Sequence, residues 1–132
     1  MNLTITFRSR SFPPLENEDD LLINEGTYGL ALLRWLQVEL AHHNVQVNEP
    51  VAEDFGWFAY LRSGKSSGGL SCLTAVVDGW QKCQIGVDIR GSWLRRFFAS
   101  QEAQAELAAV ESTLRAVLEC HTDVHQLRID KT

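Results

Sequence analysis

Apolar and polar residues alternate along several short stretches of the chain, which is the pattern of strands with one buried face. Leu3–Phe7 reads Leu, Thr, Ile, Thr, Phe, and Gln81–Arg90 places Cys83, Ile85, Val87 and Ile89 on one side. A side-chain period of two predicts a strand in each case. Further extended segments are predicted at Val45–Val47, Phe55–Leu61, Leu70–Val77 and Val124–Ile129.

Two longer segments repeat their apolar residues at the spacing of an α-helix. The first is predicted to begin at Asn24 as an N-cap and to end near His43. The second is predicted to run from Ser100 to about Cys120, after a short helical turn over Ser92–Phe98. Its expected buried stripe comprises Ala103, Leu107, Val110, Leu114, Val117 and Leu118.

The turn between the strands at 70–77 and 81–90 decides which side chains of the earlier strand face inward. A three-residue turn, residues 78–80, would send Leu73, Ala75 and Val77 to the apolar side. A two-residue turn, Asp78-Gly79, would send Cys72, Thr74 and Val76 there instead. We prefer the three-residue turn, which places Cys72 and Cys83 on opposite faces. Ser63–Gly69 is predicted to be a Gly/Ser-rich loop.

The expected order of elements is β-α-β-β-β-α-β. Consecutive strands favour an antiparallel meander, and two helices on one face would bury its apolar side. The sequence therefore predicts an α+β fold, a two-layer sandwich with a mainly antiparallel sheet, formed by residues 1–132 as a single domain.

Composition is that of an ordinary globular protein, with 45% hydrophobic and 22% charged residues among 132. The sequence has no apolar run long enough for a transmembrane helix, and its first residues lack the pattern of a signal peptide. Three cysteines without a CxxC pair are typical of a reducing compartment. We therefore expect a cytoplasmic protein that does not bind membranes.

The net charge of −5 is unevenly distributed. Between Glu16 and Asp54 nine acids stand against one base, Arg34, so this segment carries −8 and the remainder +3. Such a balance argues against binding nucleic acid through its phosphates. The acidic segment is interpreted either as a solvated surface or as a face that attracts a basic protein.

Aromatic residues concentrate just after the acidic segment, in Phe55–Leu61. Phe58 and Tyr60 share one face of this predicted strand, and Trp57 points to the other. Phe58 and Tyr60 are either exposed anchors for a partner or part of a covered central strand. If they are anchors, the predicted partner-binding residues are Glu18, Asp19, Asp20, Glu53, Asp54, Trp57, Phe58 and Tyr60.

Two stretches offer weaker chemical signals. His121, Asp123 and His125 would converge on one side of a strand, where two imidazoles and a carboxylate suit zinc or iron. The same alternation is typical of the solvent face of an edge strand, so neither a metal nor another cofactor is predicted. The segment Gly64-Lys65-Ser66 lacks the remaining glycine and the following helix of a phosphate loop, and is interpreted as a hairpin.

The run Asn24-Glu25-Gly26, followed by Glu53-Asp54-Phe55-Gly56-Trp57, resembles small bacterial proteins with an Asn-Glu-Gly helix start and a Glu-Asp-Trp-Gly-Trp strand. In this chain Phe55 replaces the first Trp of that strand. The resemblance implies a bacterial source and a helix followed by a strand. It transfers no catalytic residue.

The function expected from these patterns is non-catalytic protein binding. Its most concrete form is a bacterial immunity protein of the toxin-neutralising type, a monomer or weak homodimer that binds a basic toxin domain. The alternative is a small enzyme that uses a carboxylate near Trp57, or a metal at His121, Asp123 and His125. Glu53 and Asp54 are adjacent on a strand and point opposite ways, so they do not form a catalytic pair.

Overall fold

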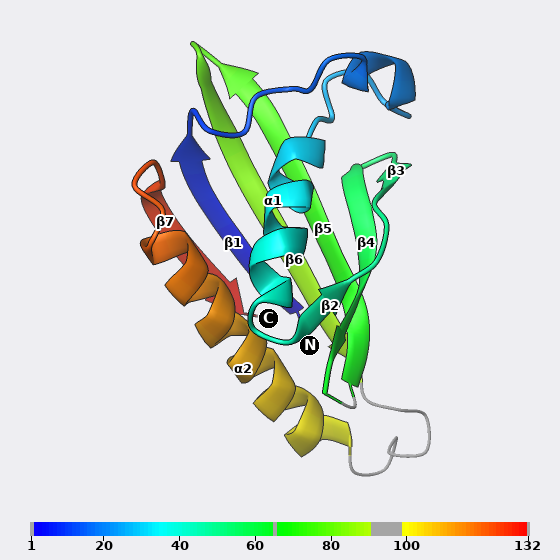
Figure 1. Ribbon diagram of the computed structural model, residues 1–132, viewed down its shortest axis with the longest axis vertical. Coiled ribbons are helices and arrows are strands. Elements are labelled where there is room, and N and C mark those ends of the chain that lie inside the picture. Colours follow the sequence, from blue (N-terminus) through cyan, green and yellow to red (C-terminus); the bar gives the residue numbers. More distant parts are fainter. Residues whose placement is uncertain (1, 65, 91–98, 132) are drawn as a thin grey trace.

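A computed structural model describes residues 2–64, 66–90 and 99–131, with the side chains of 90 and 99–103 left out. Within these ranges the chain forms one seven-stranded antiparallel sheet and two α-helices (Figure 1). The strands are β1 Asn2–Ser9, β2 Val45–Val47, β3 Val51–Glu53, β4 Gly56–Ser63, β5 Ser66–Val77, β6 Trp80–Arg90 and β7 His125–Lys131. The helices are the 3₁₀ turn η1 Glu18–Leu21, α1 Leu30–Ala41 and α2 Ala99–Glu119.

The strands lie in the order β2-β4-β5-β6-β1-β7, and β3 pairs with β4 beside β2. The α+β class predicted from the sequence is confirmed. The predicted order of elements is incomplete, because β2 and β3 form an edge of only three residues each along β4. The extended segment predicted at Val45–Val47 forms β2, whereas β3 was not predicted, because three residues are too few for an alternating pattern to identify.

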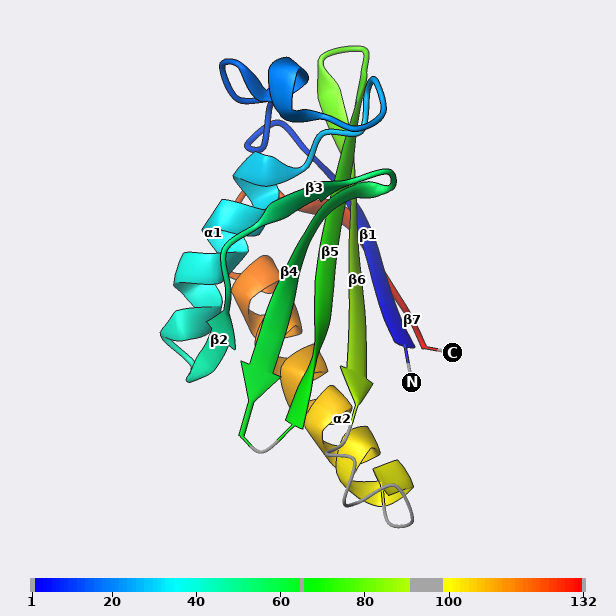
Figure 2. The ribbon, with the colours of Figure 1, turned by 90° about the vertical axis from the view of Figure 1, so that its right-hand side faces the viewer.

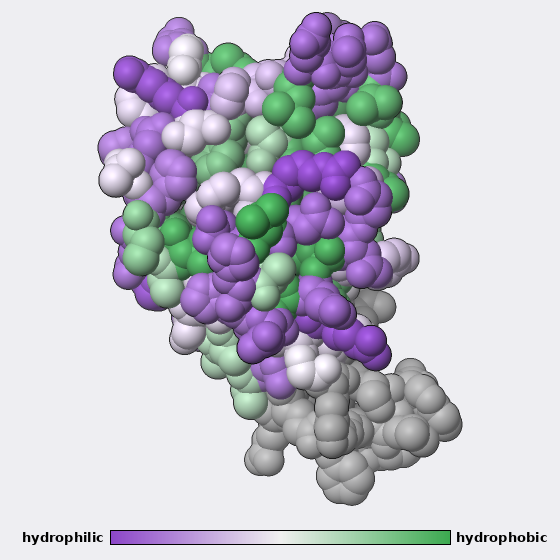
Figure 3. All heavy atoms as spheres, in the orientation of Figure 1, coloured by the Kyte–Doolittle hydropathy of each residue, from purple (hydrophilic) through white to green (hydrophobic). Residues whose placement is uncertain are grey.

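Both helices cover the same face of the sheet, which Figure 2 shows from the side. Leu3, Ile5 and Phe7 of β1 point into this layer, next to the alternating apolar residues of β6. The predicted stripe of α2 is confirmed for Leu107, Val110, Leu114, Val117 and Leu118, all of which are buried. On the outer surface of this layer, Figure 3 shows hydrophilic residues interspersed with hydrophobic ones.

The turn between β5 and β6 differs from the prediction. Val77 pairs with Trp80, so the turn has two residues, Asp78 and Gly79. Both have positive φ, 52° and 80°, which matches the right-handed twist of a hairpin. The three-residue turn was therefore wrong, and Cys72 faces the core together with Cys83, each as a free thiol.

Two further boundaries differ from the prediction. The predicted loop at 63–69 is shorter, because Ser63 pairs with Ser66 and β5 already includes Ser66–Gly69. Helix α1 begins at Leu30 instead of following Asn24, since Gly26 has φ 80° and the segment before Gly29 forms a turn. The helical turn predicted over Ser92–Phe98 falls outside the described residues.

Candidate functional site

The buried carboxylate of Glu18 organises one end of the molecule. It is 1% exposed and accepts hydrogen bonds from the backbone N–H groups of Leu15, Gly29 and Leu30 and from Nε1 of Trp57. Two of these amides open α1, where a negative charge is favourable. Because Glu18 and Trp57 bind each other in the interior, neither forms part of the exposed surface on which a partner was expected.

The loop around η1 lies against the β3–β4 turn. Nδ2 of Asn24 donates to the carbonyl oxygen of Asp54 at 2.7 Å, and the hydroxyl of Tyr28 donates to Asp19 at 2.5 Å. The Asn24 bond holds Asp54 against a loop whose acidic residues lie 29 to 38 positions earlier in the chain. We call the resulting cluster the acidic end; its exposed members are Glu16, Asp19, Asp20, Glu25 and Asp54.

Large apolar side chains are exposed among these carboxylates. Leu21, Ile23 and Phe55 are 56%, 63% and 45% exposed. The end of the molecule near η1 also carries hydrophilic residues in Figure 3. Exposed apolar groups surrounded by charge are typical of a protein-binding surface.

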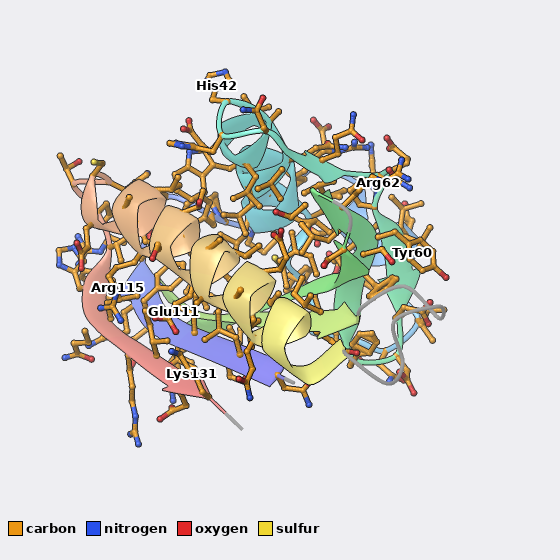
Figure 4. The ribbon with its side chains drawn as sticks, turned by 90° about the horizontal axis from the view of Figure 1, so that it is seen from below. His42, Tyr60, Arg62, Glu111, Arg115 and Lys131 are labelled. Atoms are coloured by element: carbon orange, nitrogen blue, oxygen red, sulfur yellow. The ribbon has the colours of Figure 1, made fainter. Side chains whose placement is uncertain are left out.

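A row of three aromatic rings continues from the acidic end along β4. The ring of Phe55 meets Phe58 edge-on with centroids 6.5 Å apart, and Phe58 meets Tyr60 at 5.1 Å. Tyr60 is 67% exposed, and in Figure 4 it projects outward from β4 near Arg62, across the molecule from Lys131. We call Phe55, Phe58 and Tyr60 the aromatic row.

The aromatic row forms one wall of a groove of about 690 Å³ on the face of the sheet opposite the helices. Glycines form much of its floor: a Cβ added at Gly69 would lie 2.5 Å from the ring of Phe58. An added Cβ at Gly86 would meet Oγ of Ser71 at the same distance. The polar side chains of Thr4, Gln84 and Asp88, among others, line the opposite side.

The remaining residues that were predicted to contact a partner lie at or next to the acidic end. Asp19 and Asp20 are exposed on η1, and Asp54 is exposed in the β3–β4 turn. Glu53 ends β3 and is half-buried. The carboxylate that binds the indole of Trp57 is Glu18, whereas Glu53 is half-buried and Asp54 is exposed.

His121, Asp123 and His125 do not converge as metal ligands. The pKa of Asp123 lies well below its ordinary value, first because Oγ of Ser11 donates to it and then because the amide of Arg10 does. His125 binds the other oxygen of Asp123 at 3.0 Å, while His121 accepts the Asp123 amide. Within the described chain, no three His, Cys, Asp or Glu side chains form a group that could hold a metal ion.

Comparisons with protein-family models, with curated proteins and with solved structures give no match. Among the described residues, no helix has the length and apolar character needed to cross a membrane. The function is therefore inferred from the geometry of the acidic end, the aromatic row and the groove.

Proposed function

We propose that this chain is a non-catalytic binding domain that recognises a basic protein through the acidic end and the aromatic row. The observation that carries the proposal is the Asn24–Asp54 hydrogen bond. It holds the acidic loop against the turn that bears Phe55, so charge and exposed aromatic surface are contiguous. The most concrete form is a bacterial immunity protein that neutralises a basic toxin domain.

Each part of this surface has a distinct physical role in such binding. Clustered carboxylates accelerate the encounter with a basic protein and select against acidic ones. Aromatic side chains in a desolvated centre supply most of the affinity, and Tyr is enriched among such residues. The groove beside Phe58 and Tyr60 offers a concave surface in which an apolar side chain of the partner is desolvated.

An enzymatic function has less support from the geometry. The buried carboxylate near an aromatic ring, Glu18, already accepts four N–H donors. A general acid or base needs an oxygen that can reach a substrate proton, and both Glu18 oxygens are engaged inside the protein.

The first test is affinity capture from the source cells with the tagged full chain. We expect a basic protein in equimolar amount, released by high salt. Asp20→Asn with Asp54→Asn removes two charges from the acidic end, and Glu119→Gln with Asp130→Asn removes two exposed charges elsewhere as the matched control. Capture should fall for the first pair only. Equal capture by both pairs, or the recovery of no basic protein, would contradict the proposal.

A second measurement separates general binding from toxin neutralisation. The captured protein is expressed alone and then together with this chain. Growth arrest that co-expression relieves would support the immunity form. Binding without growth arrest would support a binding domain but contradict the proposal that its partner is a toxin.

A further inference from the structure

A second charged cluster, of opposite sign, surrounds Trp80 on the face of the sheet that the helices leave open. The guanidinium carbon of Arg10 lies 4.0 Å from the centroid of the Trp80 ring, and that of Arg8 lies 4.9 Å from it. The ring of His125 meets the same indole edge-on at 5.4 Å. One aromatic ring thus orients two guanidinium groups, an arrangement that cation–π attraction stabilises.

Sheet pairing brings a third cation to this cluster. Arg8 of β1 lies directly opposite Lys82 of β6, and on its other side opposite His125 of β7. Gln81 is buried, so Trp80 and Lys82 on either side of it share the outer face. Lys82 and Arg10 are exposed and Arg8 is half-buried. We call Arg8, Arg10, Lys82 and Trp80 the basic cluster.

Among the described residues, the two arginines of the basic cluster have no acidic partner. Like charges directly opposite each other on neighbouring strands are destabilising, as Arg8 and Lys82 are here. In the part of the chain that the structure describes, neither Arg8 nor Arg10 forms an ion pair. The nearby carboxylate of Asp123 accepts the Arg10 amide and the hydroxyls of Ser9 and Ser11 instead. Arg8, Arg10 and Lys82 thus bring three cations together, while the oxygens of Asp123 are already bound by other donors.

We propose that the basic cluster is a binding site for a phosphate group, carried by free phosphate or by a small phosphate monoester. The planar fork of a guanidinium matches a phosphate with two parallel hydrogen bonds. Contact with Trp80 restricts Arg8 and Arg10 before the ligand arrives, which lowers the entropy cost of binding. A bound dianion also removes the repulsion between Arg8 and Lys82. This site is separate from the aromatic row, since β5 lies between β4, which carries Phe58 and Tyr60, and β6, which carries Trp80 and Lys82.

The test follows the indole N–H of Trp80 and the Nε–H groups of Arg8 and Arg10 by NMR, in the full chain. Inorganic phosphate and phenyl phosphate are titrated separately, and sodium chloride is titrated at matched ionic strength. We expect saturable shifts at these three groups with at least one phosphate compound and none with chloride. Tighter binding of phenyl phosphate would identify a monoester as the ligand, and tighter binding of inorganic phosphate would identify the free ion.

Variants assign the effect to the guanidinium forks. Arg8→Gln with Arg10→Gln is expected to weaken phosphate binding roughly tenfold or more. Arg8→Lys with Arg10→Lys keeps the charge and the fold but removes the guanidinium fork. Its phosphate affinity should lie between that of the double glutamine variant and that of the original chain. Arg62→Gln, an exposed arginine on β4, is the matched control and should bind unchanged.

Three results would overturn the site. The first is a shift that grows with ionic strength in the same way for chloride and phosphate. The second is an equal loss of affinity in Arg62→Gln. The third is the absence of a saturable shift with either phosphate compound; binding of a short single-stranded oligonucleotide in that case would indicate a polyanion surface in place of a phosphate site.

Discussion

At the scale of single residues, Glu18 acts as a helix cap from a distant part of the sequence. Its carboxylate binds the amides of Gly29 and Leu30, while Gly29 itself has no side chain to do so. The same carboxylate accepts the indole N–H of Trp57, so one residue joins η1, α1 and β4. A buried charge is tolerated here because donors surround it.

Replacing Glu18 by Gln is expected to destabilise the fold by about 2–3 kcal/mol, because an NH₂ group would then face N–H donors and leave at least one of them without an acceptor. Urea denaturation measures the difference in the free energy of unfolding. Asp20→Asn, an exposed acid on the same 3₁₀ turn, is the control and should change stability by less than about 0.5 kcal/mol. Equal effects of the two substitutions would contradict the role of Glu18 as a cap.

The three cysteines are expected to differ in reactivity. Burial raises the pKa of the Cys72 thiol, and burial together with the charge of Asp123 raises that of Cys83 to about 12. Thiolate is the reactive form, so neither should react in the folded protein. Cys120 is exposed. Mass spectrometry after iodoacetamide treatment should show one adduct in native protein, none in native Cys120→Ser, and three adducts in the denatured original chain. Native labelling of Cys72 or Cys83 would contradict this burial.

At the scale of elements, Asp123 fastens the start of β7 to the end of β1. Its Oδ2 accepts bonds from Ser9, Ser11 and the Arg10 amide, three donors that follow one another along the chain. Strand β7 is an edge strand that pairs only with β1 among the described strands. The hydrogen bonds of Asp123 therefore hold this edge at the end where the pairing register shifts, between Thr6 and Arg8.

The stabilisation from Asp123 is expected to depend on pH. Its folded pKa is depressed, so its contribution is present above the unfolded pKa of about 3.9 and is lost as pH falls towards the folded value. Asp123→Asn should therefore lower the melting temperature at pH 7, and the difference from the original chain should shrink below about pH 4. Thermal unfolding followed by circular dichroism measures this.

Asp130→Asn on the same strand is the matched control for this pH series, since Asp130 is exposed and pairs with Arg128 within β7. Its effect on the melting temperature should be small throughout. A difference between Asp123→Asn and the original chain that stays constant down to about pH 3 would indicate that the carboxylate charge is not the stabilising feature.

At the scale of the whole molecule, surfaces of opposite charge lie apart. The acidic end and the aromatic row lie by η1 and β4, while the basic cluster lies across the sheet on β1 and β6. The groove on the open face lies beside the aromatic row and is lined by residues of β1, β5 and β6 as well. The net charge of −5 is therefore the sum of two surfaces of opposite sign and the rest of the chain.

The acidic end and the aromatic row, as the two parts of the proposed protein interface, are expected to affect different kinetic steps of binding. With the captured partner, Asp20→Asn with Asp54→Asn should slow association and weaken its dependence on salt. Phe55→Ala with Tyr60→Ala should mainly accelerate dissociation, because the desolvated contacts break only on separation. Surface plasmon resonance at two salt concentrations separates these effects. Association rates that are independent of salt for the original chain would contradict electrostatic steering.

Local patterns determined much of the layer structure from the sequence alone. Alternation placed β1 and β6 and their buried faces, and helical periodicity placed the buried stripe of α2. The same alternation assigned Trp57 to one face of β4 and Phe58 and Tyr60 to the other. These features depend on neighbours a few positions apart, which is the range over which a periodic pattern carries information.

The contacts that define the candidate sites were decided only in the tertiary structure. The burial of Glu18 depends on Trp57, 39 residues away, and the basic cluster depends on β1 and β6 pairing across most of the chain. The β5–β6 turn could also form in two registers from local sequence, and the observed one was settled by the twist of paired strands. The sequence by itself determined which side chains alternate and where charge accumulates. Folding determined which of them meet, because long-range pairing and burial are collective properties of the whole chain.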